Sequence, residues 1–179
     1  MTATVVPAQD AVFIVLRTFI KSIINCEVIQ GLGNYVSMPV GGFIAITPLF
    51  QTKLSTNYNT FHDGTFDTVP TEVMTQSSLQ AAELTIQIDC YGVNSAEWAT
   101  AISTLLRDDY GCIALAPYCQ PLHADDPKQM PLITGEENFE QRWTLNAVLQ
   151  YNPVTTVPIE FFDEAIVSTI NVEATYTLQ

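Results

Sequence analysis

Two stretches of the 179-residue chain alternate apolar and polar residues with a period of two, and this pattern constrains the fold most. The first runs from Leu84 to Cys90, and the second runs from Trp143 to Tyr151. Alternation of this kind is typical of strands that bury one face of a sheet and leave the other open. A third alternating stretch, from Ile170 to Leu178, predicts a last strand. The sequence therefore predicts a sheet with one covered face.

Two other segments have helical spacing. Asp10 is the expected N-cap of a helix over residues 11–25, whose apolar residues lie nearly all round its axis. We expect that helix to be sandwiched, either inside the fold or against another subunit. A second helix is expected after Asn94, with Glu97 completing a capping box and Gly111 in the left-handed position that ends it.

The segment between the first helix and the strand at Leu84 is less regular. Residues 36–54 read as extended chain, bent or bulged at Gly41-Gly42 and at Pro48. Residues 55–78 then scatter aromatic side chains among Thr, Asn, Ser, Asp and Gly. A loop of this length in a compact domain is usually functional or ordered by a partner. We interpret it as the tip of a long hairpin, and its aromatic residues form either a satellite cluster or, as its length favours, a protein interface.

The order of these elements predicts the fold class. A Pro-rich connection over residues 116–135 separates the second helix from the strand at Trp143, and Pro153 and Pro158 end that strand. The fold class is α+β, an antiparallel or mixed β-sheet flanked by two main helices, with a long β-hairpin arm. No repeat or boundary divides the chain, so we expect one domain over residues 1–179, with the long hairpin or loop at about residues 52–80.

Charge limits the partners that the chain can have. Charged residues make up 14% of the chain, and 6 cations face 19 acids, giving a net charge of -13. Tight binding to a phosphate backbone needs clustered cations, whereas these six are scattered. A specific nucleic-acid binder is therefore excluded. An acidic wall past which DNA slides fits this balance, and so does a simple need for solubility. The uncharged polar surface is typical of subunits that contact neighbours.

The apolar stretch from Val12 to Ile24 is too short and too charged to predict a signal peptide or a membrane span. We therefore expect no membrane partner, and synthesis and assembly in a reducing bacterial cytoplasm. The four cysteines show no C-x-x-C spacing, and Cys90 and Cys112 read as small buried hydrophobes. A zinc site has little support.

A search for catalytic chemistry finds one cluster. His123 with Asp125 and Asp126 could form a metal or general-base site, but Asp-Asp-Pro is also a common turn sequence, which we favour. Glu136, Glu137 and Glu140 read as a solvated loop. The chain contains no nucleophile-elbow, phosphate-loop, dinucleotide or zinc-protease motif. We expect no enzyme activity, no cofactor, no catalytic residue and no bound metal.

Two segments resemble the neck proteins of tailed bacteriophages, of the tail-terminator or tail-completion type. The first is IQIDCYGVNSAEWATAISTLLRDDYGC, residues 86–112, in which a strand and a Tyr-Gly turn lead into a helix carrying a Trp. The second is PLHADDPKQMPLITGEENFEQRWTLNAVLQYNP, residues 121–153. The resemblance covers roughly residues 10–178 and is weakest between about 52 and 78.

This resemblance implies a structural virion protein that forms a homo-oligomeric ring, expected to be a hexamer. The ring would cap the tail tube and join it to the head-tail connector or adaptor, with the tail sheath as a further partner and DNA passing through without sequence recognition. Candidate subunit-interface residues are Tyr58, Phe61, Phe66, Asp125, Asp126, Glu140 and Arg142, although Arg142 could instead pair with an acid on an adjacent strand. The alternatives are a baseplate or decoration protein and a small hydrolase using His123 and Asp125.

Overall fold

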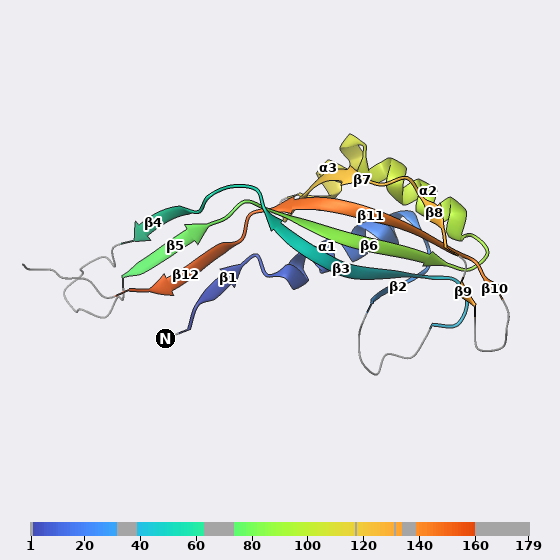
Figure 1. Ribbon diagram of the computed structural model, residues 1–179, viewed down its shortest axis with the longest axis horizontal. Helices are drawn as coiled ribbons and strands as arrows, with labels where there is room; N and C mark the ends of the chain where they lie inside the picture. Colours follow the sequence, from blue (N-terminus) through green and yellow to red (C-terminus); the bar gives the residue numbers. More distant parts are fainter. Residues whose placement is uncertain are drawn as a thin grey trace, which may run out of the picture.

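The computed structural model of the protein describes residues 2–31, 39–62, 74–116, 118–130, 132–133 and 139–159 (Figure 1). Its helices are α1 (Gln9–Ile23), α2 (Ser95–Leu106) and α3 (Asp109–Leu115). Its strands are β1 (Thr4–Val6), β2 (Glu27–Gln30), β3 (Phe43–Lys53), β4 (Tyr58–His62), β5 (Thr75–Leu79), β6 (Ala82–Tyr91), β7 (Gln120–Ala124), β8 (Lys128–Gln129), β9 (Leu132–Ile133), β10 (Phe139–Glu140), β11 (Arg142–Tyr151) and β12 (Val154–Pro158).

The main sheet has the strand order β2-β3-β6-β11-β7, and β8 also pairs with β11. β2 and β3 run parallel, while the other pairs of this sheet are antiparallel. The sheet is therefore mixed, and with its helices it confirms the predicted α+β class. The strands predicted from the alternation over residues 84–90 and 143–151 are confirmed as β6 and β11, which are neighbours in this sheet.

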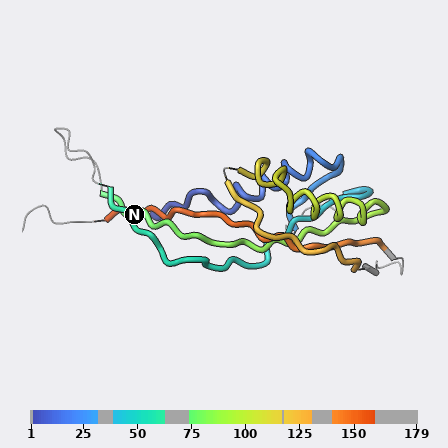
Figure 2. The backbone as a smooth tube through the Cα atoms, turned by 90° about the horizontal axis from the view of Figure 1, so that it is seen from above, coloured from blue at the N-terminus to red at the C-terminus, as the bar shows by residue number. Residues whose placement is uncertain are grey.

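The three helices lie on one side of this sheet (Figure 2). The strands turn their apolar rows toward the helices, so that Leu145 of β11 lies opposite Ile88 of β6, and Leu149 lies opposite Leu84. These side chains join Leu16 and other apolar residues of α1 and α2 in one buried core. The opposite face of the sheet carries Thr, Gln and Asn, and no helix of the described residues covers it. The one-sided pattern of the sequence is thus met by a single helical layer.

A second sheet extends from the main one, with the order β1-β12-β5-β4. Three of its strands continue the central strands of the main sheet: β3 leads into β4, β5 into β6 and β11 into β12. In Figure 1 these strands run past the helices and project from the body. We call β1, β4, β5 and β12 the arm sheet. The tip of the hairpin expected between β4 and β5 lies outside the described residues, so the complete hairpin stays a prediction.

The first helix differs from its prediction in its ends and its surroundings. It begins at Gln9 with Ala8 as N-cap, and Asp10 lies in its first turn, where a negative charge favours the helix dipole. Its side chains are also not buried all round, because Ile14 is 64% exposed. A sandwiched position inside the described fold is therefore wrong, and contact with another subunit stays a prediction.

The N-cap position predicted for the second helix is confirmed, whereas its capping bonds and its predicted C-terminal cap are wrong. Asn94 is the N-cap of α2 by position, but its backbone lies at φ -94° and ψ 10° rather than extended, and its side chain makes no capping bond. The helix ends at Leu106, and Gly111 lies buried inside α3. A Cβ atom at Gly111 would clash with the backbone of Leu105 and Leu106. Glycine is needed there for the close approach of α3 to the end of α2, not for a left-handed cap.

Several extended segments also differ from expectation. The strand expected over 36–54 is β3, with the predicted bulge after Pro48, whereas residues 36–38 lie outside the described part. The Pro-rich connection over 116–135 contains β7, β8 and β9. Pro153 ends β11 as expected, but β12 follows at once and reaches Pro158. The strand predicted over 170–178 lies outside the described residues.

We expect the buried core between the main sheet and its helices to contribute most of the stability of the fold. Leu16 on α1 is fully buried, so Leu16→Ala should lower the free energy of unfolding by about 2–5 kcal/mol through lost burial and a residual cavity. Ile113→Ala on α3 is the matched control, because Ile113 is 68% exposed and should change stability by less than about 0.5 kcal/mol. Urea unfolding of both variants measures the difference, and equal losses would contradict this packing.

Candidate assembly surface

The register of the arm sheet gathers like side chains into rows. Val6, Val154, Leu79 and Tyr58 lie side by side across the four strands and form an apolar row. Two positions farther along, on the same face, lies a row of hydroxyl side chains from Thr4, Thr156, Ser77 and Thr60. Within it the hydroxyls of Ser77 and Thr156 are 3.0 Å apart. One face of the arm sheet therefore offers an apolar row beside a hydroxyl row.

The arm sheet has no core of its own. Every residue of its four strands is exposed or half-buried, including the apolar ones. Tyr58 is 67% exposed, Phe61 62% and Val6 66%, and Leu49, Phe50 and Leu54 at the base of the arm are exposed as well. Exposed apolar side chains gathered in one place mark an interaction surface more often than scattered ones do.

The strands of the arm sheet carry no Asp, Glu, Lys or Arg, although the chain has a net charge of -13. Within the described residues β1 pairs only with β12, and β4 pairs only with β5, so both are edge strands. Natural edge strands usually carry charges that prevent pairing with another chain. An uncharged edge at each side of an exposed sheet is therefore suited to association.

The predicted interface residues fall into two groups. Tyr58 and Phe61 lie on β4, but on opposite faces of the arm sheet, since they are three positions apart along the strand. Phe66 lies outside the described residues. Asp125, Asp126, Glu140 and Arg142 lie outside the arm sheet, on or beside the main sheet that the helices cover (the body). The sequence did not indicate this separation.

Asp125 and Asp126 follow β7 and bind groups of their own chain. Asp125 accepts a hydrogen bond from the side chain of Asn146 at 3.1 Å and lies 3.3 Å from the His123 imidazole. The Arg107 guanidinium beside Asp126 lowers the pKa of that carboxyl, at an N···O distance of 2.7 Å. Arg107 also donates to the carbonyl of Ala124, which ties the link between β7 and β8 to the end of α2. The predicted turn is wrong, because β7 and β8 both pair antiparallel with β11 and the amide of Asp125 donates to the carbonyl of Asn146, so the chain runs straight on along one edge.

Arg142 pairs with an acid on an adjacent strand. Its guanidinium lies 3.0 Å from Asp89 on β6, and Asp89 is 4% exposed. The amide of Gln87 donates to the same carboxylate, and the guanidinium also lies 5.6 Å from the centre of the Tyr91 ring. Burial, with Asp89 as the second cause, raises the pKa of the Tyr91 hydroxyl. The helix-free face of the sheet therefore holds a satisfied ion pair. Glu140 lies half-buried two residues away, on β10.

Within the described residues, no group of three or more His, Cys, Asp or Glu side chains is placed to hold a metal ion. Burial raises the pKa of the Cys90 thiol to about 12 and that of Cys119 to about 11, so neither is a ready nucleophile. Cys90 is buried as expected, while Cys112 is half-buried. No helix in the described part of the chain is long and apolar enough to cross a membrane.

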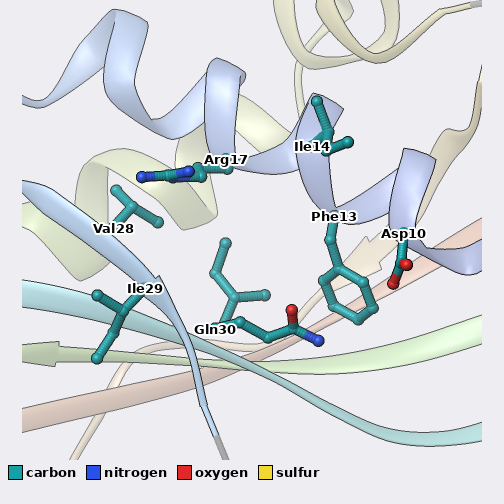
Figure 3. Close-up of a pocket in the computed structure, with 8 residues that line it drawn as sticks. Asp10, Phe13, Ile14, Arg17, Val28, Ile29 and Gln30 are labelled. Atoms are coloured by element: carbon teal, nitrogen blue, oxygen red, sulfur yellow. The ribbon is translucent and has the colours of Figure 1, made fainter. Parts of the chain in front are cut away.

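Two features of the surface were not predicted from the sequence. The first is β1, which is three residues long and forms one edge of the arm sheet. The second is a groove of about 520 Å³ between α1 and β2, shown in Figure 3. A short edge strand carries little periodicity, and a groove between two elements depends on their packing. Neither leaves a local pattern in the sequence.

An exposed, uncharged sheet beside a conventional core defines a structural subunit that assembles with other proteins. The comparisons agree with this class. The chain matches the model of the phage neck terminator protein family over residues 10–174, and it belongs to that family. It is a structural protein of the bacteriophage virion, located in the neck, where other phage tail or head proteins are its partners. A comparison with curated proteins finds no match.

The buried ion pair yields a stability prediction. Arg142→Met removes the cation from the buried Asp89 carboxylate and should cost about 3–5 kcal/mol of unfolding free energy. Combining it with Asp89→Asn should recover most of that loss, because no unpaired charge is then buried. Urea unfolding of the single and double variants measures the coupling. Strictly additive losses would show that the two side chains do not interact.

Proposed function

We propose that this protein is the ring-forming tail terminator of a phage neck, a homo-oligomer, expected to be a hexamer. It caps the tail tube and joins it to the head-tail connector or adaptor, and it meets the tail sheath where the tail has one. The observation that carries the proposal is the arm sheet, which is exposed, uncharged and without a buried core of its own. A sheet of this kind gains stability by joining a neighbour.

The strand order of the arm sheet suits a ring. Its four strands alternate in direction, so the edge strands β1 and β4 run in opposite directions. When the arms of two copies point the same way, β4 of one copy meets β1 of the next as an antiparallel pair. This contact joins two different surfaces, which is the head-to-tail relation that a closed cyclic ring requires.

Charge supports the same arrangement. Two copies that each carry a net charge of -13 repel one another over most of their surface. The strands of the arm sheet are uncharged, so contact there avoids this repulsion. We propose that the acidic remainder lets DNA pass through the ring without adhering, since a strongly acidic wall offers phosphate groups no counter-charge.

The predicted interface residues take two roles in this proposal. Tyr58 and Phe61, together with Phe66, contact the neighbouring arm, where large aromatic side chains gain most from burial. Asp125, Asp126, Glu140 and Arg142 form a second, polar contact between subunits on the body. The internal pairs of Arg142 and Asp126 limit that second contact to a small share of the binding energy, because their charges are already compensated.

Assembly can be tested with charge placed in the arm sheet. The purified protein should have a mass in light scattering that is a multiple of 19.8 kDa, six copies for a hexamer, and images should show a central hole. Tyr58→Lys combined with Phe61→Lys should abolish assembly in solution and on isolated tails, because each copy would then bring two charges into the contact.

Thr100→Lys on the exposed side of α2 is the matched control and should assemble like the unchanged protein. Failure of the unchanged protein to assemble either alone or on tails would contradict the proposal. An assembly without ring symmetry would favour a baseplate or decoration protein. His123→Ala should leave assembly unchanged, and loss of a hydrolytic activity in that variant would favour the hydrolase alternative.

A further inference from the structure

The groove between α1 and β2 is open to solvent, and the apolar side chains of its floor are packed into the core of the chain. Phe13, Val28 and Ile46 form this floor, and the exposed Ile14 and the half-buried Ile29 stand beside it. Figure 3 shows Phe13 descending from α1 toward the side chains of β2, while Ile14 lies beside the helix, above Phe13. With about 520 Å³ of volume, the groove has room for several side chains of an added segment.

The backbone of β2 makes this groove a site for an extended chain. Within the described residues β2 pairs only with β3, so its outer edge has unpaired backbone groups. An added strand would pair with that edge and direct alternate side chains into the groove. The site therefore fits a strand with one apolar face.

Charge narrows the occupant to an acidic segment. Arg17 lines the groove and Lys21 lies one turn farther along α1, and both are exposed. Neither forms an ion pair within the part of the chain that the structure describes. They are two of six cations in the chain. Asp10 also lines the groove, and Glu27 is the acid of β2, so the cations lie at the Arg17 end of the groove.

We propose that the groove binds the C-terminal segment of a neighbouring copy of this chain, which pairs with β2. Twenty residues follow Ile159. They include the alternating apolar residues Ile170, Val172, Ala174, Tyr176 and Leu178, with Glu173 between them, and they carry four acids and no Lys or Arg. The segment has both the one-sided apolar pattern and the charge that the groove requires.

We assign the bound C-terminal segment to a neighbouring copy because β12 of the same copy ends away from the groove. In Figure 1 its last residues lie on the arm, away from α1 and β2. The segment thus leaves the chain where copies are proposed to meet, and residues 160–169, if extended, would reach roughly 33 Å farther. The inference rests on the proposed self-assembly and adds a second link between the same two copies.

Photo-crosslinking of the full chain tests the occupant. A copy with p-benzoylphenylalanine in place of Ile14 should crosslink to residues 160–179, and mixing isotopically light and heavy protein should show that the link joins two copies. The same group in place of Ile113 is the matched control, because that isoleucine is equally exposed on α3. It should give no such link. Links from position 14 to residues 32–38, to the same copy's C-terminal segment or to another tail protein would overturn the inference.

Charge reversal at the groove tests whether its occupant is acidic. Arg17→Glu combined with Lys21→Glu should weaken assembly roughly tenfold, because the groove would then repel a segment that carries four acids. Lys128→Glu on β8 is the control and should leave assembly unchanged. If assembly occurs but reversing Arg17 and Lys21 leaves it unchanged, the inference fails and the proposed ring stands. A protein that stays monomeric in solution and on tails overturns both.

Discussion

The structure depends on the fact that its central strands are longer than the layer of helices that covers them. β3, β6 and β11 bury their apolar rows beneath α1, α2 and α3, and beyond that layer the same chains continue as β4, β5 and β12. There is no second layer in the described part of the arm, so its side chains stay exposed or half-buried. A sheet gains little stability without a covered face. The apolar rows of the main sheet are therefore covered within the chain, whereas the strands of the arm sheet are not, and this difference is the basis of the proposed assembly.

The body and the arm sheet differ in the charge of their side chains. The body contains the ion pairs of the described structure and satisfies them internally, as Asp89 and Arg142 do on the helix-free face. The strands of the arm sheet are uncharged and present hydroxyl and apolar rows, which cost less to desolvate than ions do. Membership of the phage neck terminator family agrees with this division, because a structural protein of the neck contacts other phage tail or head proteins.

Much of the body could be predicted from the sequence, because period-two alternation directly reports a half-buried strand. β6 and β11 were found in this way, with Leu84 and Trp143 on the apolar side as expected. The arm strands were not, because an exposed strand without a buried face carries no alternation. The helix caps failed for another reason. Glycine is needed at position 111 because α3 approaches the end of α2 closely there, and sequence spacing contains no information on that contact. The interface residues were predicted from residue type alone, and the structure shows that Arg142 already pairs with Asp89.

In the proposed assembly the two edges of the arm sheet pair with neighbouring copies. Hydrogen exchange of the backbone amides of β1 and β4, compared between dilute protein and protein assembled on isolated tails, measures this most directly. Amides at both edges should become strongly protected on assembly, while those of the already paired β6 and β11 should change little. Edge amides that exchange equally fast in both states would show that copies meet elsewhere, and would contradict the claim.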